Sequence, residues 1–105
     1  MLRLYNNIIS TLVLNSNRTN ENLEELNTYI DKNDCSYMTV DISNLNILDA
    51  STIATLGSTM HYIKYPEGKI NWIVNSSKVK EYTDSMNLGN STFSDKSGSI
   101  ENRKA

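Results

Sequence analysis

Residues 40–56 read VDISNLNILDASTIATL and contain the change from strand to helix on which the fold depends. This stretch completes a β-rich run over residues 37–42 whose apolar side chains occupy every second position: Met38, Val40 and Ile42. Such alternation is typical of a strand with one buried face. Residues 43–44, Ser-Asn, then favour a turn. The sequence therefore predicts a central strand that leads through a short loop into a helix.

The helix is predicted from residue 51 to about residue 64, because apolar side chains recur there every three to four positions. These side chains form its main apolar face: Ile53, Leu56, Met60 and Ile63. Asp49, Ser51 or Thr52 can cap the helix, since short polar side chains accept hydrogen bonds from the free N–H groups of a first turn.

Before this stretch, two short runs with strand character, residues 2–5 and 8–14, flank the pair Asn6-Asn7. Asparagine tolerates the positive φ of a tight turn, so an antiparallel hairpin is expected to open the chain. A first helix follows, capped by Thr19 or Asn20. Its apolar residues share one face: Leu23, Leu26, Tyr29 and Ile30.

After it, the turn at residues 66–68 leads to a strand over residues 70–74, and Ser76 or Ser77 can cap a third helix. That helix carries apolar residues at helical spacing: Val79, Tyr82 and Met86. The order β-β-α-β-α-β-α predicts an α/β fold with a mixed, mainly parallel sheet and helices packed on it. Residues 1–93 are expected to form one domain, and residues 94–105, with a single apolar residue, a disordered tail.

Composition narrows the classes of function. The chain has 105 residues, 10 basic and 12 acidic side chains and a net charge of -2, with no block of Lys or Arg. We therefore expect no direct binding to nucleic acid. No apolar run approaches the ~20 residues of a membrane-spanning helix, so no membrane insertion is expected. The single cysteine, Cys35, excludes an internal disulfide, and a cytoplasmic protein is the simplest interpretation.

The chain shows little sign of catalytic chemistry. It has no nucleophile elbow, no glycine-rich phosphate loop and no cluster of metal ligands, so neither an enzyme, a cofactor nor a metal is expected. Its only histidine, His61, lies off the apolar face of its helix and is predicted to be a surface residue. An alternative keeps Asp41, Asp49, Ser51 and His61 as the groups of a small enzyme or phosphoacceptor.

Asp41 is the residue that favours a phosphoacceptor. It ends the central strand, as the phosphoryl-accepting aspartate does in response-regulator receivers. A receiver also carries an acidic pair for Mg²⁺ after its first strand, and here Asn15-Ser16-Asn17 stands in that place.

A family resemblance covers roughly residues 1–93. The chain contains Asp41-Ile42-Ser43, then a short apolar link, and then Asp49-Ala50-Ser51-Thr52-Ile53 at a helix start. Together these pieces resemble the STAS domain. This is the fold of bacterial anti-sigma factor antagonists and of the cytoplasmic ends of sulfate transporters. The likeness continues in register through residues 70–75, 77–79 and 86–93. The family's glycine-containing loop after the second strand is absent, and residues 15–18 replace it.

The resemblance implies a non-enzymatic signalling module that regulates transcription by binding an anti-sigma factor or kinase-like protein. Its partner-binding residues would be Asp49, Ala50, Ser51 and Thr52. In the antagonists a phosphorylated hydroxyl follows the aspartate, but Ala50 occupies that position, which leaves Ser51 and Thr52 as possible phosphorylation sites. Because Ala50 lacks a hydroxyl, an unphosphorylated scaffold subunit, transporter-associated or in a multi-protein complex, is the alternative.

Overall fold

The computed structural model describes residues 11–96, and these form an alternating series of strands and helices. In chain order they are β1 (Thr11–Val13), α2 (Thr19–Lys32), β2 (Tyr37–Asp41), α3 (Ile47–Lys64), β3 (Lys69–Val74), α4 (Ser77–Asp84) and β4 (Ser91–Asp95). The expected strand at residues 2–5 and its turn lie outside the described residues, as do residues 97–105.

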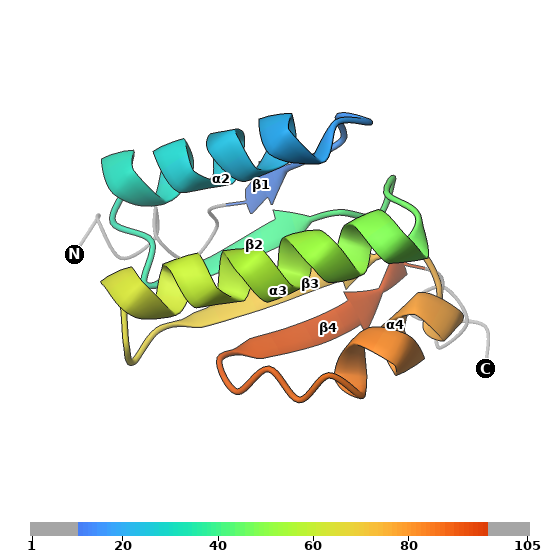
Figure 1. The fold of residues 1–105 in the computed structure, drawn as a ribbon. Helices are drawn as coiled ribbons and strands as arrows, with labels where there is room; N and C mark the ends of the chain where they lie inside the picture. The colour runs from blue at the N-terminus through green and yellow to red at the C-terminus, as the bar shows by residue number, and fades with distance from the viewer. Residues whose placement is uncertain (1–10, 97–105) are drawn as a thin grey trace.

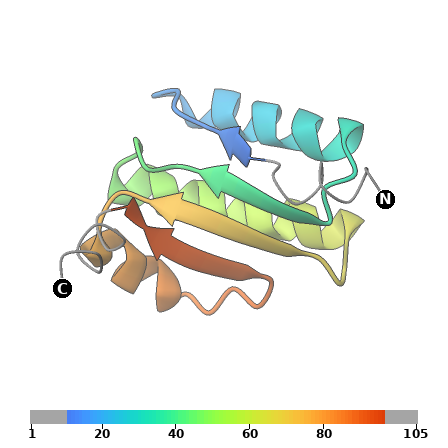
Figure 2. The same cartoon turned by 180° about the vertical axis from the view of Figure 1, so that it is seen from behind.

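The four strands form one parallel sheet in the order β1-β2-β3-β4. Each helix carries the chain back to the starting edge of the sheet, which is what parallel pairing requires. The three helices lie side by side on one face of the sheet, with α3 between α2 and α4, as the two opposite views show (Figures 1 and 2). The predicted α/β class is therefore confirmed, while the antiparallel part of the expected sheet lies beyond the described range.

The core lies between the sheet and the helix layer. Every second residue of β2 and β3 points into it, so the strand alternation seen in the sequence is a true burial pattern. Trp72 is its largest fully buried side chain. A Cβ on Gly57 of α3 would lie 2.6 Å from Leu26 Cδ2 and 2.8 Å from Trp72 Cη2. A glycine at position 57 therefore lets α3 approach α2 and the indole closely.

The last strand of the described residues, β4, was not predicted from the sequence. It pairs in parallel with β3 and places Phe93 opposite Trp72. Its sequence is STFSD, in which only Phe93 is apolar and buried, so no alternation signals a strand. Ser94 and Asp95 belong to β4, so the predicted tail begins two residues too early.

Helix α3 differs from its prediction at its start and in its orientation. It begins at Ile47, where the Asn46 side chain caps it by accepting a hydrogen bond of 2.8 Å from Asp49 N. Leu56 and Ile63, expected on the buried face, are 45% and 74% exposed. The residues that face the core are mostly small: Ala50, Ile53, Ala54, Gly57, Ser58 and His61. The small buried side chains gave a weaker periodic signal than the large exposed ones.

Candidate functional site

The loop that leads into α3 is held by short hydrogen bonds at the carboxyl edge of the sheet. Asp41 Oδ1 accepts a hydrogen bond of 2.9 Å from the backbone N–H of Ser43. Asn75, from the loop after β3, donates to the Ser43 carbonyl oxygen at 2.9 Å. Asp41 therefore stabilises a local turn, of the kind that aspartate side chains commonly form. These bonds fix the position from which α3 begins.

The four predicted partner-binding residues lie in the first two turns of α3. Ala50 is completely buried, so its methyl group packs in the core and can only shape the surface above it. Ser51 Oγ and Thr52 Oγ1 donate to the carbonyl oxygen of Leu48, at 3.0 and 2.9 Å. They are bonded within the helix, so the prediction that one of them caps it was wrong. Asp49 stays partly exposed beside them.

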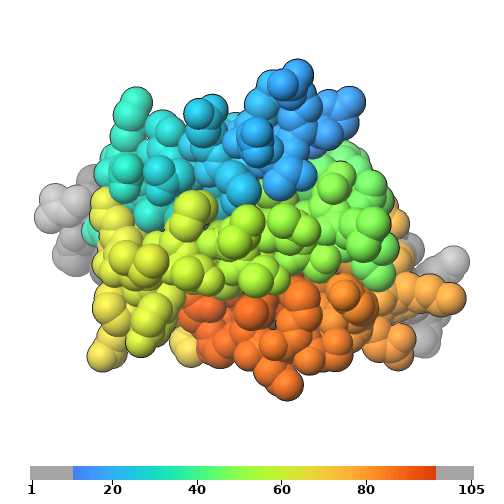
Figure 3. Space-filling view, viewed as in Figure 1, coloured from blue at the N-terminus to red at the C-terminus, as the bar shows by residue number. Residues whose placement is uncertain are grey.

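The outer side of α3, which we call the α3 face, carries large apolar side chains in contact with solvent. Its exposed residues are Leu48, Thr52, Thr55, Leu56, Thr59, Tyr62 and Ile63. Leu48 is 71% exposed and Ile63 is 74% exposed. Between Asp49 and Lys64 the helix sequence contains no Asp, Glu, Lys or Arg. Figure 3 shows α3 crossing the middle of this side of the molecule, with α2 and α4 on either side.

The threonines of the α3 face have their hydroxyl groups already bonded to the helix backbone. Thr55 Oγ1 donates to Ser51 O at 2.8 Å, and Thr59 Oγ1 donates to Thr55 O at 3.0 Å. Thr52 does the same to Leu48 O. Each hydroxyl has thus used its single donor. The α3 face can consequently lose water at a smaller polar cost than its threonine content suggests.

A shallow groove of about 430 Å³ lies between α2 and the part of α3 around Met60, beside the α3 face; we call it the α2–α3 groove. Its lining residues are Asn20, Leu23, Glu24, Asn27 and Met60. Leu23 and Met60 pack against the hydrophobic core, whereas Asn20, Glu24 and Asn27 are exposed. The groove therefore has an apolar base and a polar wall on α2.

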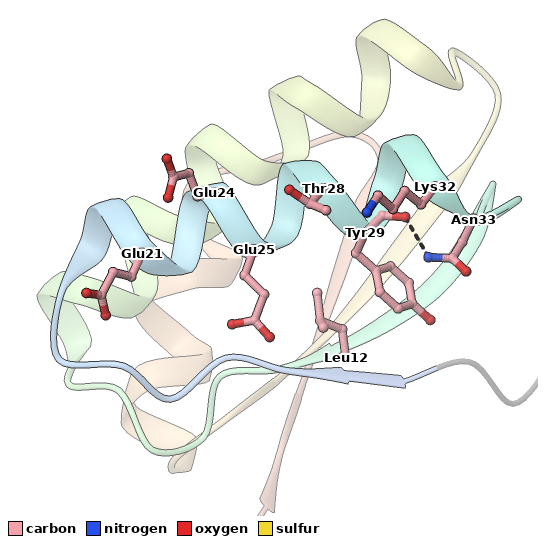
Figure 4. A pocket seen from close by; sticks show the side chains of 8 residues that line it. All are labelled: Leu12, Glu21, Glu24, Glu25, Thr28, Tyr29, Lys32 and Asn33. Atoms are coloured by element: carbon pink, nitrogen blue, oxygen red, sulfur yellow. Dashed lines mark hydrogen bonds between the residues drawn. The ribbon is translucent and has the colours of Figure 1, made fainter.

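A second hollow, of about 550 Å³, lies on the other side of α2, next to β1. In Figure 4, Leu12 of β1 and Tyr29 and Glu25 of α2 point into it, while Glu24, which also lines it, points away from Glu25. It is also lined by Lys32 and by Asn33, whose side chain donates to the Tyr29 carbonyl oxygen at 2.9 Å. Glu24 and Glu25 thus both line this hollow, and of the two only Glu24 also lines the α2–α3 groove.

His61 lies in the core, so its prediction as a surface residue was wrong. The ring is 0% exposed, and its Nε2 lies 2.8 Å from the carbonyl oxygen of Cys35. A carbonyl only accepts hydrogen bonds, so Nε2 carries the proton. Nδ1 has no hydrogen-bond partner among residues 11–96. Burial lowers the pKa of the imidazole, and the bond to Cys35 opposes this more weakly.

The structure does not bring together the four groups of the enzymatic alternative. Ser51 and His61 are both in α3, ten residues apart, which separates them by ~15 Å along the axis. Asp41 is bonded to Ser43 at the carboxyl edge of the sheet, whereas His61 contacts Cys35, just before β2 begins. Within residues 11–96, no three His, Cys, Asp or Glu side chains are grouped to hold a metal ion.

Asn22 holds the loop after β1, which also lies at the carboxyl edge of the sheet. This role was not predicted from the sequence. Its buried side-chain amide donates to Ser16 O at 2.9 Å and accepts from Ser16 N at 3.2 Å. The expected capping by Thr19 or Asn20 does not occur, because α2 begins at Thr19 without a side-chain cap. The available signal was a polar residue at position 22, in helical register with the apolar Leu26 and Ile30.

Compared with protein-family models, curated proteins and solved structures, the chain has no match. The STAS resemblance therefore rests on the sequence motifs alone and stays a prediction. Among the helices of residues 11–96, none has the length and apolar character needed to cross a bilayer.

Proposed function

We propose that the protein is a non-enzymatic interaction module that binds a protein partner through the α3 face and the loop before it. The observation that carries this proposal is the uncharged α3 face, with its exposed large apolar side chains. A helix that is apolar all round is normally buried on all sides. Among residues 11–96 only one side of α3 is buried, so a partner is the natural cover for the other side.

Burying this face would release substantial free energy. Complete burial of a Leu or Ile side chain favours association by ~1.5–3 kcal/mol before the entropy of association is subtracted. Leu48, Leu56 and Ile63 offer such contacts along one helix. Interface centres are typically depleted of charged residues, which is also true of this face.

The partner class follows from the STAS resemblance: an anti-sigma factor or kinase-like protein that contacts Asp49, Ser51 and Thr52. Phosphorylation of Ser51 or Thr52 would add a charge of about -1.5 to -2 beside Leu48. It would also replace the hydroxyl hydrogen bond to the Leu48 carbonyl oxygen. A partner that buries Leu48 would then be repelled, which makes the hydroxyls a suitable switch.

The second candidate function is a constitutive scaffold that uses the same surface without phosphorylation, in a transporter-associated or other multi-protein complex. Ala50 favours it, because the position of the usual phosphorylated hydroxyl is buried and has no oxygen. The two candidates share the α3 face and differ only in whether Ser51 or Thr52 is modified.

Binding to a histidine-kinase-like anti-sigma factor tests the surface. We expect Asp49→Lys and Leu56→Asp to abolish capture of that partner, and Glu81→Lys, at an exposed position on α4, to leave it unchanged. Unchanged capture by both α3 variants would remove this surface from the proposal.

Intact-mass measurement separates the two candidates. The protein is incubated with the partner kinase and ATP before its mass is determined. A single added phosphate on Ser51 or Thr52 supports the switched module. An unmodified mass, with capture intact, supports the constitutive scaffold.

A further inference from the structure

We propose that the α2–α3 groove selects a partner helix that carries an arginine or lysine along one edge, next to its apolar face. This inference rests on the proposed function and adds the chemistry of the partner to it. Its basis is the juxtaposition of an apolar helix face with a groove whose wall holds a carboxylate, Glu24.

The shape and lining of the groove suit a long basic side chain. Leu23 and Met60 offer apolar surface against which the methylene stem of Lys or Arg can lie. Glu24 stands on the same wall as Asn20 and Asn27. Its carboxylate can bind the charged group, and the amide oxygens can accept its remaining donors.

Glu24 is the carboxylate available for this role. Among the described residues, Glu21 is paired with Arg18 and Asp31 with Lys64, whereas Glu24 has no ion-pair partner. A partner that buries the α3 face would remove water from this carboxylate. An unpaired charge is costly to desolvate, so a cation at this place is strongly preferred over a neutral or acidic group.

A helix fits the α3 face better than an irregular segment does. Leu48 and Ile63 lie on the same side of α3, about 22 Å apart along its axis at ~1.5 Å per residue. Apolar anchors spaced along such a straight face match side chains at i, i+3, i+4 and i+7 of a partner helix.

A second copy of this chain is a poorer occupant. The only Lys or Arg within α3 is Lys64, and it is paired with Asp31. The α3 helix of a second copy would therefore offer Glu24 no unpaired Lys or Arg of its own.

Three synthetic amphipathic peptides, each as long as α3, test the inference. All carry the same leucine face, and the residues along one edge are arginine, glutamine or glutamate. Binding is measured by fluorescence anisotropy at ~0.15 M salt, where charges further than ~8 Å apart are largely screened. The protein variants are Glu24→Arg and, as the matched control, Glu25→Arg, at a neighbouring position that does not line the α2–α3 groove (Figure 4).

We expect the wild type to bind the arginine peptide about tenfold more tightly than the glutamine peptide, or ~1.4 kcal/mol. Glu24→Arg should reverse the order of the arginine and glutamate peptides, and Glu25→Arg should keep it. Equal effects of the two variants would overturn the inference, because they would reflect net charge alone.

Two further outcomes also contradict it. In the first, the wild type binds the arginine and glutamine peptides equally and Leu56→Asp binds neither. This outcome would contradict selection by charge but leave the α3 face as the proposed surface. In the second, no peptide binds at ~1 mM, which corresponds to a binding free energy of about -4 kcal/mol. This outcome would overturn the proposal that the groove binds a helix.

Discussion

At the scale of single residues, the hydrogen bonding of the buried His61 imidazole determines which protonation state the folded protein favours. One nitrogen is satisfied by Cys35, and the other has no partner in the described part of the chain. Protonation would add a buried donor at Nδ1 and a positive charge in an apolar environment. Both effects favour the neutral form, so the folded protein resists protonation of His61.

Stability should therefore fall at mildly acidic pH. An unfolded histidine has a pKa of ~6.5, and burial places the folded pKa of His61 lower. Above pH ~6.5 both states are neutral and stability is complete. Below it the unfolded state alone takes up a proton, so the free energy of unfolding decreases until the pH reaches the folded pKa. Urea unfolding at a series of pH values measures this loss.

His61→Gln is the control for that measurement. Glutamine can still donate to the Cys35 carbonyl oxygen but does not titrate. The variant should be less sensitive to pH than the wild type over the same interval. Identical pH profiles for the two proteins would show that His61 is not the group responsible.

A methyl group at position 57 should destabilise the fold. Alanine is a better helix former than glycine by ~1 kcal/mol. Its Cβ would, however, lie 2.6 Å from Leu26 Cδ2 and 2.8 Å from Trp72 Cη2. Overpacking of this kind costs ~1–3 kcal/mol, so we expect Gly57→Ala to lower Tm.

Gly89→Ala is the matched comparison, because a Cβ at that position meets nothing within 4 Å. It should leave Tm unchanged or raise it slightly. A Gly57→Ala protein as stable as the wild type would mean that α3 moves away from the sheet at little cost.

At the scale of elements, α3 shows what the periodicity of apolar residues can predict and what it cannot. Its existence follows from the spacing of apolar residues, but its orientation does not, because apolar residues occur on both sides. The buried side consists mainly of small residues, and at Gly57 the small size is required by the close approach of Leu26 and Trp72. Two residues of the surface that we propose for partner binding, Leu56 and Ile63, were thus assigned to the core by periodicity.

Exposed apolar residues on α3 should be replaceable without loss of stability. Leu48→Ser and Ile63→Ser change side chains that are 71% and 74% exposed. Surface substitutions usually alter the free energy of unfolding by less than ~0.5 kcal/mol. Ile53→Ser, at a fully buried position of the same helix, should cost several times more. Chemical denaturation compares the three, and a loss above ~1 kcal/mol at either exposed position would show that it is packed.

At the scale of the whole molecule, the alternation of strands and helices was sufficient to predict a parallel sheet with helices packed on it. β4 escaped prediction because four of its five residues are polar. The loop contacts at the carboxyl edge also escaped, because they join residues distant in sequence, such as Asn75 and Ser43. Local sequence patterns were therefore enough to predict the other helices and strands. The edge strand β4 and the surroundings of the site could not be predicted in this way, because they depend on tertiary contacts.

A network of side chains ties α3, β3 and β4 together. Trp72 Nε1 donates to Ser91 Oγ at 3.0 Å, and Ser91 also contacts Ser58 of α3. Ser91→Ala would leave the buried indole N–H without its acceptor, so we expect a loss of ~1–3 kcal/mol in the free energy of unfolding. Ser94→Ala, on the exposed side of the same strand, is the control and should change little. Equal stability of the two variants would contradict this role for Ser91.

The parallel order of the sheet also has a consequence for how quickly the chain reaches its native state. Leu12 pairs with Val40, Val40 with Trp72, and Trp72 with Phe93, so a whole helix separates each pair in sequence. Within residues 11–96 no strand can therefore pair through a short hairpin. Each pairing has to await closure of a long loop, which slows folding relative to a helical bundle of this size. We expect helices to form locally before the sheet assembles, with β4 joining only after Trp72 is in place.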